Sequence, residues 1–452
     1  MSSTRTPRTN CAKNNETNKT KKSTVRHTRA IQRDRSKTPI VGPPNEKIQE
    51  VLSEVIHPAT FAQLDAYRAS GLRERILTLP VMVAFVLSLL WRQMGSVQDA
   101  VRALNREGLL WTAPVRVTQQ AVSERLRNLP AELFERICKT VLPKMQERAD
   151  ARKRPMPGPI ARALKHFRRV LILDGSTLDA LVRKVGLLRD LPKNPLAGRM
   201  AALLNAASRL PEQVWYEEAS TAHDQRFWER AVETLQAGCL LLFDLGFTNF
   251  GYFDRLTAQR VSFVTRAKQN LKFTVQATLL DTPQARDQII TTGATEPLRL
   301  VQVLYRGRWF RYLTNVLDPH VLSAEDVVGL YWQRWRIEDA YHVAKRLLGL
   351  SYLHVGSING VQVQVWCTWL LYSALIDLAD AVAEKLLRPL ADISIEMVFR
   401  SLYHYTQAHH RGEADDPIAY LADPQNRDLG ITKQKKRDSL SRFAVLTNAL
   451  SS

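Results

Sequence analysis

Apolar and polar positions repeat along the chain with two different periods. Between residues 46 and 150 apolar positions recur every three or four residues, the spacing of helices that bury one face. The helices predicted there span 45–55, 58–70, 79–92, 96–107, 118–126 and 131–147. We therefore expect a compact helical domain over 46–150, followed by a basic, proline-rich linker over 152–159.

The period changes beyond residue 160. Short continuous apolar runs appear, and such runs are typical of strands buried on both faces. The predicted strands are 170–174, 200–207, 213–218, 238–244 and 261–267, with a hairpin joining the second and third and a helix over 223–236. Strands that alternate with helices predict an α/β domain with a mixed sheet and flanking helices over 160–350.

Residues 268–322 interrupt the α/β pattern. Four short strands with interleaved arginines are expected at 273–277, 288–292, 298–305 and 309–316, which predicts a β-rich insertion. Helices follow over 323–349, 361–387 and 393–410, so that C-terminal helices are expected within 351–425.

The predicted helix 323–349 carries a polar stripe. Ser323 is a good N-cap, and Gly349 is a good C-cap. Tyr331 and the three charged residues that share its stripe lie within a sector of about 60° if each residue turns the helix by about 100°; these three are Arg334, Glu338 and Lys345. Taken alone, the stripe also suits a surface helix with ordinary ion pairs.

The charge balance changes this picture. The 452-residue chain has a formal net charge of +20, and residues 1–40 account for +9 of it. The strong excess of positive charge predicts a polyanionic partner. We expect residues 1–45 to form a disordered basic arm that binds nucleic acid, although their composition also resembles an organelle transit peptide, and residues 426–452 to form a basic tail.

Other classes are not favoured by the sequence. The four cysteines lack the spacing of a zinc site or a disulfide framework. The apolar runs 79–91 and 365–376 fall short of the roughly 20 residues that a spanning helix needs. No membrane association is therefore expected, and no secretory signal is visible.

One predicted helix in the N-terminal region resembles the second helix of a helix-turn-helix. Thr118 would cap it, and Gln119, Gln120, Ser123 and Arg125 would face outward. The connection 108–117 is longer than the usual turn of that motif. DNA readout and ordinary packing are equally compatible with this segment.

Candidate chemistry comes from acids at the ends of strands. Asp174 and Asp244 each end an apolar run, and carboxyl ends of neighbouring strands meet in one crevice. If the helix with Glu338 lies across that edge, three carboxylates meet and need a cation between them. Oxygen ligands suit Mg²⁺, and a pair of such ions supports phosphoryl transfer on DNA.

At these residues the chain resembles a known family. Tyr331, Arg334, Glu338 and Lys345 match the Tyr-Arg-Glu-Lys signature of bacterial insertion-sequence transposases of the IS-four group. Asp174-Gly-Ser-Thr and Asp244-Leu-Gly-Phe resemble the two aspartate motifs of that group, although Leu245 stands where many members have a basic residue.

The resemblance carries several expectations. It implies an RNase H-like catalytic domain with a β-rich insertion, and a triad of Asp174, Asp244 and Glu338 that binds two Mg²⁺ ions, for which Mn²⁺ substitutes. It also implies DNA contacts by Tyr331, Arg334 and Lys345 at the cleaved end.

Other polar and aromatic residues near these motifs are open to two interpretations. Trp309 is either a core residue of the insertion or, as in some members of the family, a platform for a flipped base. We expect core packing for Trp332 and Trp335, and a solvated or structural role for the nearby acids Asp179, Asp190, Glu217 and Glu218. His223 beside Asp224 suits either acid-base chemistry or a polar cluster at the start of a helix, and we favour the cluster.

The sequence thus predicts a transposase that binds terminal inverted repeats as a homodimer on double-stranded DNA, cleaves them and joins them to target DNA. We expect it in the bacterial cytoplasm, associated with the nucleoid. Two rivals remain: an RNase H-like nuclease or resolvase without strand transfer, and a catalytically inactive DNA-binding protein derived from a transposase.

Overall fold

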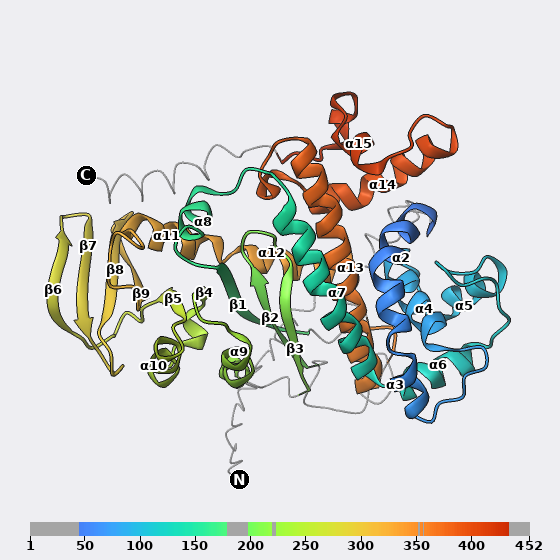
Figure 1. Ribbon diagram of the computed structural model, residues 1–452, viewed down its shortest axis with the longest axis horizontal. Helices are drawn as coiled ribbons and strands as arrows, with labels where there is room; N and C mark the ends of the chain where they lie inside the picture. Colours follow the sequence, from blue (N-terminus) through green and yellow to red (C-terminus); the bar gives the residue numbers. More distant parts are fainter. Residues whose placement is uncertain (1–44, 179–197, 219–222, 351–352, 356, 434–452) are drawn as a thin grey trace, which may run out of the picture.

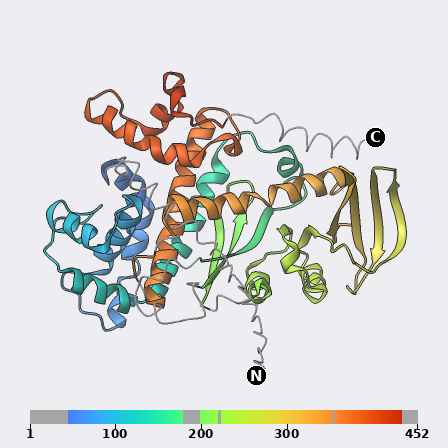
Figure 2. The ribbon, with the colours of Figure 1, turned by 180° about the vertical axis from the view of Figure 1, so that it is seen from behind.

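The computed structural model describes residues 45–178, 198–218, 223–350, 353–355 and 357–433 (Figure 1). The predicted arm up to residue 44, the tail from residue 434, and Asp179 and Asp190 lie outside the described residues. A long mixed sheet forms the centre of the molecule, with helices on both of its faces (Figures 1 and 2). This arrangement confirms the predicted α/β class.

Within the described residues, nine strands form one continuous sheet in the order β3-β2-β1-β4-β5-β9-β8-β7-β6. Strand β1 pairs in parallel with β4, which pairs in parallel with β5, whereas the other neighbours are antiparallel. The strands are β1 (Arg169–Thr177), β2 (Arg199–Asn205), β3 (Pro211–Glu217), β4 (Cys239–Phe243), β5 (Ser262–Arg266), β6 (Thr274–Asp281), β7 (Ala285–Thr291), β8 (Leu298–Tyr305) and β9 (Arg308–Thr314).

The apolar runs of β1 and β4 are explained by burial on both faces. Leu171 and Leu173 face a core beneath α9 (Trp228–Thr234) and α10 (Phe250–Ala258), whereas Ile172 between them faces the larger core on the other side. Because successive side chains of a strand point to opposite faces, a central strand covered on both sides needs apolar residues without alternation.

The N-terminal helices follow the predicted pattern with two differences. The first helix continues through Pro58 to Phe61, where a second helix was expected to begin, and a short helix begins at Gly158 inside the predicted linker 152–159. They are α2 (Asn45–Phe61), α3 (Leu64–Ala69), α4 (Leu79–Trp91), α5 (Val97–Arg106), α6 (Gln119–Asn128), α7 (Ala131–Ala151) and α8 (Gly158–Ala163). Their apolar faces share one core with the sheet and with α13 (Ile358–Lys385), against which α7, α4, α6 and α2 pack. The helical region is therefore built into the same body as the sheet, while its predicted limits as a domain stay a prediction.

Helix α13 is longer than the apolar run 365–376 suggested. It continues through buried polar residues such as Gln364 and Ser373, whose side chains do not interrupt a helix inside the protein. Within the described residues it is the helix that is long and apolar enough to cross a membrane, and 89% of its apolar window is buried inside the protein.

The predicted linker 152–159 is fixed to α13 by ion pairs. Arg152 contacts Asp377 at 2.6 Å, and both Arg152 and Arg154 pair with Asp380, whose side chain is buried. Burial raises the pKa of Asp380, and the two arginines oppose this rise. The charges of Arg152 and Arg154 therefore balance buried acids.

The remaining helices and short helical segments lie between the strands or after them in the chain. They are α11 (Ala324–Gln333), α12 (Arg336–His342), α14 (Ile395–His410) and α15 (Pro417–Ala422), together with the short segments η3 (Asp224–Phe227), η4 (Leu245–Phe247), η5 (Val343–Leu347), η6 (Leu390–Asp392) and η7 (Pro424–Leu429). Figure 2 shows α11 and α12 crossing the sheet from the strands β8 and β9 towards α13.

The predicted β-rich insertion extends the central sheet. Strand β9 pairs with β5, and β8, β7 and β6 follow outward. Arg306 and Gly307 close the β8–β9 hairpin with φ values of 49° and 72°, the left-handed conformation that tight hairpin turns require. The insertion is thus an extension of the same sheet.

One of the arginines interleaved in the strands of the insertion is buried. The side chain of Arg299 on β8 has no exposed area, and its Nε and Nη2 donate to the carboxylate of Asp287 on β7. Its Nη1 donates to the carbonyl of Leu322 at 2.6 Å. The sequence pattern could not distinguish this residue from its exposed neighbours, because the partner carboxylate lies on another strand.

Replacing Arg299 by alanine should destabilise the protein strongly. The change leaves the Asp287 carboxylate buried without its partner, which costs about 3–5 kcal/mol. Chemical denaturation followed by circular dichroism measures the free energy of unfolding. The exposed Arg308 on the same sheet is the control, and Arg308→Ala should change that free energy by less than about 0.5 kcal/mol. Equal effects of the two changes would contradict the role given to Arg299.

Candidate active site

The helix predicted over 323–349 forms a continuous helical path, made of α11, α12 and η5, whose backbone hydrogen-bond pattern changes twice. Ser323 caps α11 through Oγ, which accepts from the amide of Asp326. At Arg334 and Trp335 the path tightens, with amide-to-carbonyl bonds from Arg334 to Tyr331 and from Ile337 to Arg334, and α12 then runs into the π-helical η5. The expectation of one regular helix was therefore wrong. Irregular turns of this kind are frequent at functional sites.

The two strand-end acids lie next to one another in the sheet. The parallel register of β1 and β4 pairs Leu173 with Phe243, and Asp174 and Asp244 are the next residue on each strand. Both therefore stand at the carboxyl ends of adjacent central strands, where side chains converge in α/β sheets.

The three predicted acids meet around one guanidinium group, that of Arg334. Its Nη1 donates to Asp174 Oδ2 at 3.1 Å, and its Nη2 donates to Glu338 Oε1 at 3.1 Å. Its Nε lies 4.0 Å from Asp244 Oδ1. The Arg334 side chain is 6% exposed, whereas the Asp244 and Glu338 side chains are 42% and 43% exposed. A buried cation thus holds one buried and two half-exposed carboxylates.

Asp174 is the most strongly perturbed of these acids. Burial raises its pKa to about 7, and the negative charges of Asp244 and Asp224 add to this effect. The charge of Arg334 and the hydrogen bond from the amide of Gly175 act in the opposite direction. The charge of Arg334 therefore does not fully offset the cost of burying the ionised form of Asp174.

Tyr331 and Lys345 bind the helical path to the same two strands. The Tyr331 hydroxyl donates to Asp244 Oδ1 at 3.0 Å, and burial raises its pKa above the ordinary value, which keeps it a neutral donor. Lys345 Nζ donates to Ser176 Oγ at 2.7 Å and to the carbonyl of Thr177 at 2.5 Å. The structure thus brings the four residues of the predicted stripe to the ends of β1 and β4.

Trp309 lies apart from this cluster on β9. It stands opposite Leu304 in the β8–β9 hairpin, and the guanidinium of Arg286 on β7 lies 5.0 Å from the centre of its ring. Its indole is half-buried. This environment does not decide between a packing role and base stacking.

Tyr341 is part of the site but was missed in the sequence. Its buried hydroxyl donates to the carbonyl of Asp174 at 2.7 Å and accepts from the amide of Ala202 at 3.1 Å. It therefore links α12 to both β1 and β2. Its offset of ten residues from Tyr331 places it beside the polar stripe, a signal that could have identified it.

Two tryptophans of the helical path are exposed, contrary to the packing role expected for them. Trp332 is 40% exposed and Trp335 is 52% exposed. The ring of Trp335 lies 5.3 Å from the guanidinium carbon of Arg334. The structure therefore places an exposed aromatic ring beside the residue that holds the three acids.

The predicted recognition helix corresponds to α6, capped by Thr118. Gln119 and Gln120 are exposed, but Arg125 donates to the hydroxyl of Tyr67 and to the carbonyl of Arg73 at 2.9 Å. Arg125 therefore has a structural role in the N-terminal helices. Because the two glutamines are exposed, DNA readout by this helix stays a prediction.

The acid cluster suits a divalent cation by its donor chemistry. Carboxylate oxygens are the ligands that Mg²⁺ and Mn²⁺ prefer, and a bound cation would favour the ionised form of Asp174, whose pKa burial raises to about 7. Among the described residues, however, no three acidic, histidine or cysteine side chains come close enough together to hold one metal ion. The guanidinium of Arg334 lies between the carboxylates, and its positive charge stands in for that of a metal ion.

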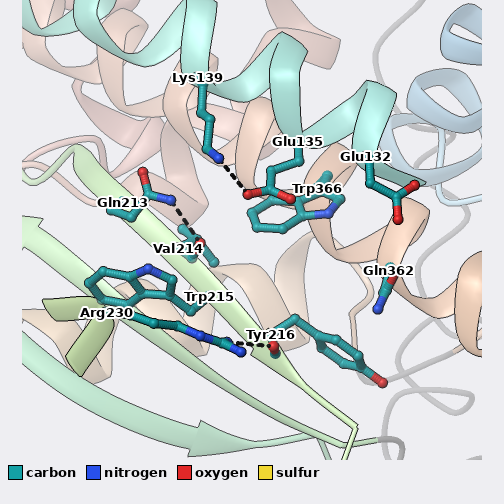
Figure 3. A pocket seen from close by; sticks show the side chains of 10 residues that line it. All are labelled: Glu132, Glu135, Lys139, Gln213, Val214, Trp215, Tyr216, Arg230, Gln362 and Trp366. Carbon is teal, nitrogen blue, oxygen red and sulfur yellow. Dashed lines mark hydrogen bonds and ion pairs between the residues drawn. The ribbon is translucent and has the colours of Figure 1, made fainter. Parts of the chain in front are cut away.

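A surface pocket of about 330 Å³ lies elsewhere, at the edge strand β3 (Figure 3). Within it Lys139 pairs with Glu135, and Arg230 donates to the carbonyl of Tyr216. None of the three clustered acids lines this pocket. The residues that line it come from α7, β3, α9 and α13: Glu132, Glu135, Lys139, Gln213, Val214, Trp215, Tyr216, Arg230, Gln362 and Trp366.

Comparison with known proteins adds an independent observation. Residues 165–373, which contain all three acids and the helical path, match the family described as "Transposase DDE domain". The chain is 25% identical over 342 residues to a probable transposase for insertion sequence element IS5377 of Geobacillus stearothermophilus, with 72% of this chain and 82% of the relative covered. These matches support a DDE transposase.

Among solved structures, the chain resembles the piggyBac transposase synaptic complex with hairpin DNA, with a TM-score of 0.41 and 12% sequence identity. The likeness covers 87% of this chain and 82% of that chain. At this level it does not establish a common fold. The support for a transposase therefore comes from the matched domain and the IS5377 relative.

Replacing Arg334 by glutamine should alter how the protein responds to divalent cations. Without metal, the variant should be destabilised by roughly 1–3 kcal/mol, because buried hydrogen-bonded acids lose their partner. The stabilisation by added Mn²⁺ should exceed that of the wild type, because no guanidinium competes with the ion. Thermal unfolding in EDTA and in Mn²⁺ measures both effects.

Arg336→Gln is the matched control, because Arg336 faces the half-exposed Asp339 at 3.8 Å and not the three acids. Its Mn²⁺ response should equal that of the wild type. If Arg334→Gln also gained no more stability from Mn²⁺ than the wild type, the guanidinium would not be standing in a cation site.

Proposed function

We propose that the protein is a DNA transposase that cleaves the terminal inverted repeats of an insertion sequence and joins them to target DNA. The observation that carries the proposal is the meeting of Asp174, Asp244 and Glu338, from two strands and a helix, inside the residues that match the transposase DDE domain. These three residues are assigned as the catalytic acids. The strand order β3-β2-β1-β4-β5 supports an RNase H-like core.

The three acids would hold two Mg²⁺ ions, and Mn²⁺ would substitute. Such ions supply an activated water or hydroxyl and stabilise the leaving oxygen of the phosphodiester. The protein's own part is to hold the carboxylates at the ends of β1 and β4, through Tyr331 on Asp244 and Tyr341 on the backbone of Asp174.

Double-stranded DNA is the proposed partner, and the formal net charge of +20 supports it. Tyr331, Arg334 and Lys345 are proposed to contact the cleaved end, and Trp309 to contact a base. Arg334 and Lys345 currently face protein oxygens, so that each must leave its present partners to reach a phosphate. Pairing of two DNA ends calls for a homodimer, and the proposed location is the bacterial cytoplasm, on the nucleoid.

Two rival functions remain distinguishable by experiment. A nuclease or resolvase of RNase H-like fold would cleave the same DNA without joining it to a target. An inactive DNA-binding descendant would bind the DNA without cutting it. The presence of all three acids in one cluster favours the catalytic alternatives.

Glu338→Gln should abolish strand cleavage while leaving DNA binding largely intact. The change keeps the shape of the side chain but removes a charge that a metal ligand needs. The substrate is a plasmid that carries the gene with its flanking DNA, and cleavage in Mg²⁺ is followed on gels. Asp339→Asn on the same helix is the control and should cleave as the wild type does. Normal cleavage by the Glu338 variant would remove the basis for the triad.

Lys345→Ala should weaken binding of the same DNA and lower the slope of log affinity against log salt by about one phosphate contact. Filter binding or fluorescence anisotropy over a salt series measures the slope. The exposed Lys385 at the end of α13 provides a control, and Lys385→Ala should leave the slope unchanged. An unchanged slope for Lys345→Ala would assign this lysine to its contacts with Ser176 and Thr177 alone.

A further inference from the structure

A fourth carboxylate, that of Asp224, lies against the two backbone segments that carry Asp174 and Asp244. A Cβ atom built on Gly175 would lie 2.1 Å from Asp224 Oδ1, and one built on Gly246 would lie 3.3 Å from Asp224 Oδ2. Gly175 directly follows Asp174, and Gly246 is two residues beyond Asp244. Each carboxylate oxygen therefore faces a glycine of a different aspartate motif.

Steric space, and not backbone conformation, explains the glycine at 175. Gly175 lies within β1 and pairs with Ala201, and its φ lies outside the left-handed region that favours glycine. An L-residue could adopt this backbone, but its Cβ would meet Asp224 at a distance that real atoms do not reach. The Asp224 carboxylate thus fills the space that a side chain at position 175 would need.

Arg199 holds Asp224 in this position. Its Nη2 lies 2.5 Å from Asp224 Oδ1, and the two side chains are 19% and 20% exposed. Arg199 is the cross-strand partner of Thr177, so its guanidinium is fixed beside the end of β1. Its positive charge allows a fourth carboxylate to stand close to Asp174 and Asp244 without adding uncompensated negative charge.

We propose that Asp224 is a positioning residue that spaces the aspartates 174 and 244, acting as a wedge between the backbone at Gly175 and at Gly246. The proposal rests on the proposed function, because the spacing matters only if the two aspartates share divalent cations. Asp224 touches the backbone beside the catalytic acids and not the reacting groups. For Asp224 this role is more specific than the polar cluster at a helix start that the sequence predicted for His223 and Asp224.

A double-mutant cycle tests the wedge on the full chain. The variants are Gly175→Ala, Asp224→Ala and the two combined, and the readouts are Mn²⁺ affinity by calorimetry and the thermal midpoint in EDTA. Each single change should weaken Mn²⁺ binding by about 10–100-fold, the usual effect of losing a group that orients metal ligands. In the double variant the new methyl group occupies the vacated space, so the loss should not exceed that of either single variant.

Two further variants separate shape from other effects. Asp224→Asn keeps the outline of the wedge and should retain more Mn²⁺ affinity than Asp224→Ala. Gly95→Ala is the control for a glycine near an aspartate, because its Cβ would lie at an ordinary 3.6 Å from Asp99 Oδ2. It should leave both readouts unchanged.

The outcomes distinguish this inference from the proposed function. If the wild type binds Mn²⁺ and Asp224→Ala binds it equally well, or if the losses of the single variants multiply, the wedge is overturned while the proposed function stands. If the wild type does not bind Mn²⁺ even when the DNA substrate is present, the metal site and the positioning role both fail. Coupling of the thermal midpoints alone would then leave Asp224 a purely structural residue.

Discussion

The site depends on one electrostatic constraint, the balance between the Arg334 guanidinium and three carboxylates. Asp174, Asp244 and Glu338 come from elements far apart in the chain, and like charges at such distances repel strongly when burial limits screening by water. Arg334 is nearly buried among them and offsets this repulsion. The helical path α11–α12 can therefore rest on the ends of β1 and β4, where each of its polar contacts also fixes the position of a carboxylate or of the backbone that bears it.

The rest of the fold makes this contact rigid. The sheet is covered on both faces, so the ends of its central strands are set by packing on either side. Helix α13 joins the N-terminal helices to the core beneath the sheet, and buried ion pairs from Arg152 and Arg154 fix the intervening segment to it. The regions with different sequence patterns are thus packed into one body, although the changes of pattern suggested separate modules. Whatever the exposed face of α6 binds, it is connected to the acid cluster through continuous packing.

Local signals made much of this architecture predictable. An apolar run that ends in an acid identified the ends of β1 and β4, and caps such as Ser323 identified the start of the helix opposite them. What the sequence did not reveal depends on partners distant in the chain. Arg299 resembles its exposed neighbours until Asp287 is seen beside it, and Asp224 resembles a helix-start residue until Gly175 is seen against it. The tightened turn at Arg334 was not predicted for the same reason. A helix that was expected to be regular is bent by the contacts that its side chains make with residues distant in the chain.

The contacts of Arg334 with the acids and its proposed contact with DNA constrain how DNA and metal bind. One guanidinium cannot donate to Asp174 and Glu338 and at the same time neutralise a DNA phosphate. If the proposed function holds, moving Arg334 to DNA leaves three carboxylates without a countercharge, and divalent cations are the groups suited to replace it. Binding of DNA and binding of metal must then favour one another, because thermodynamic linkage is reciprocal. A resting protein whose acids are already partly neutralised by its own arginine would gain its full affinity for metal only where DNA is present.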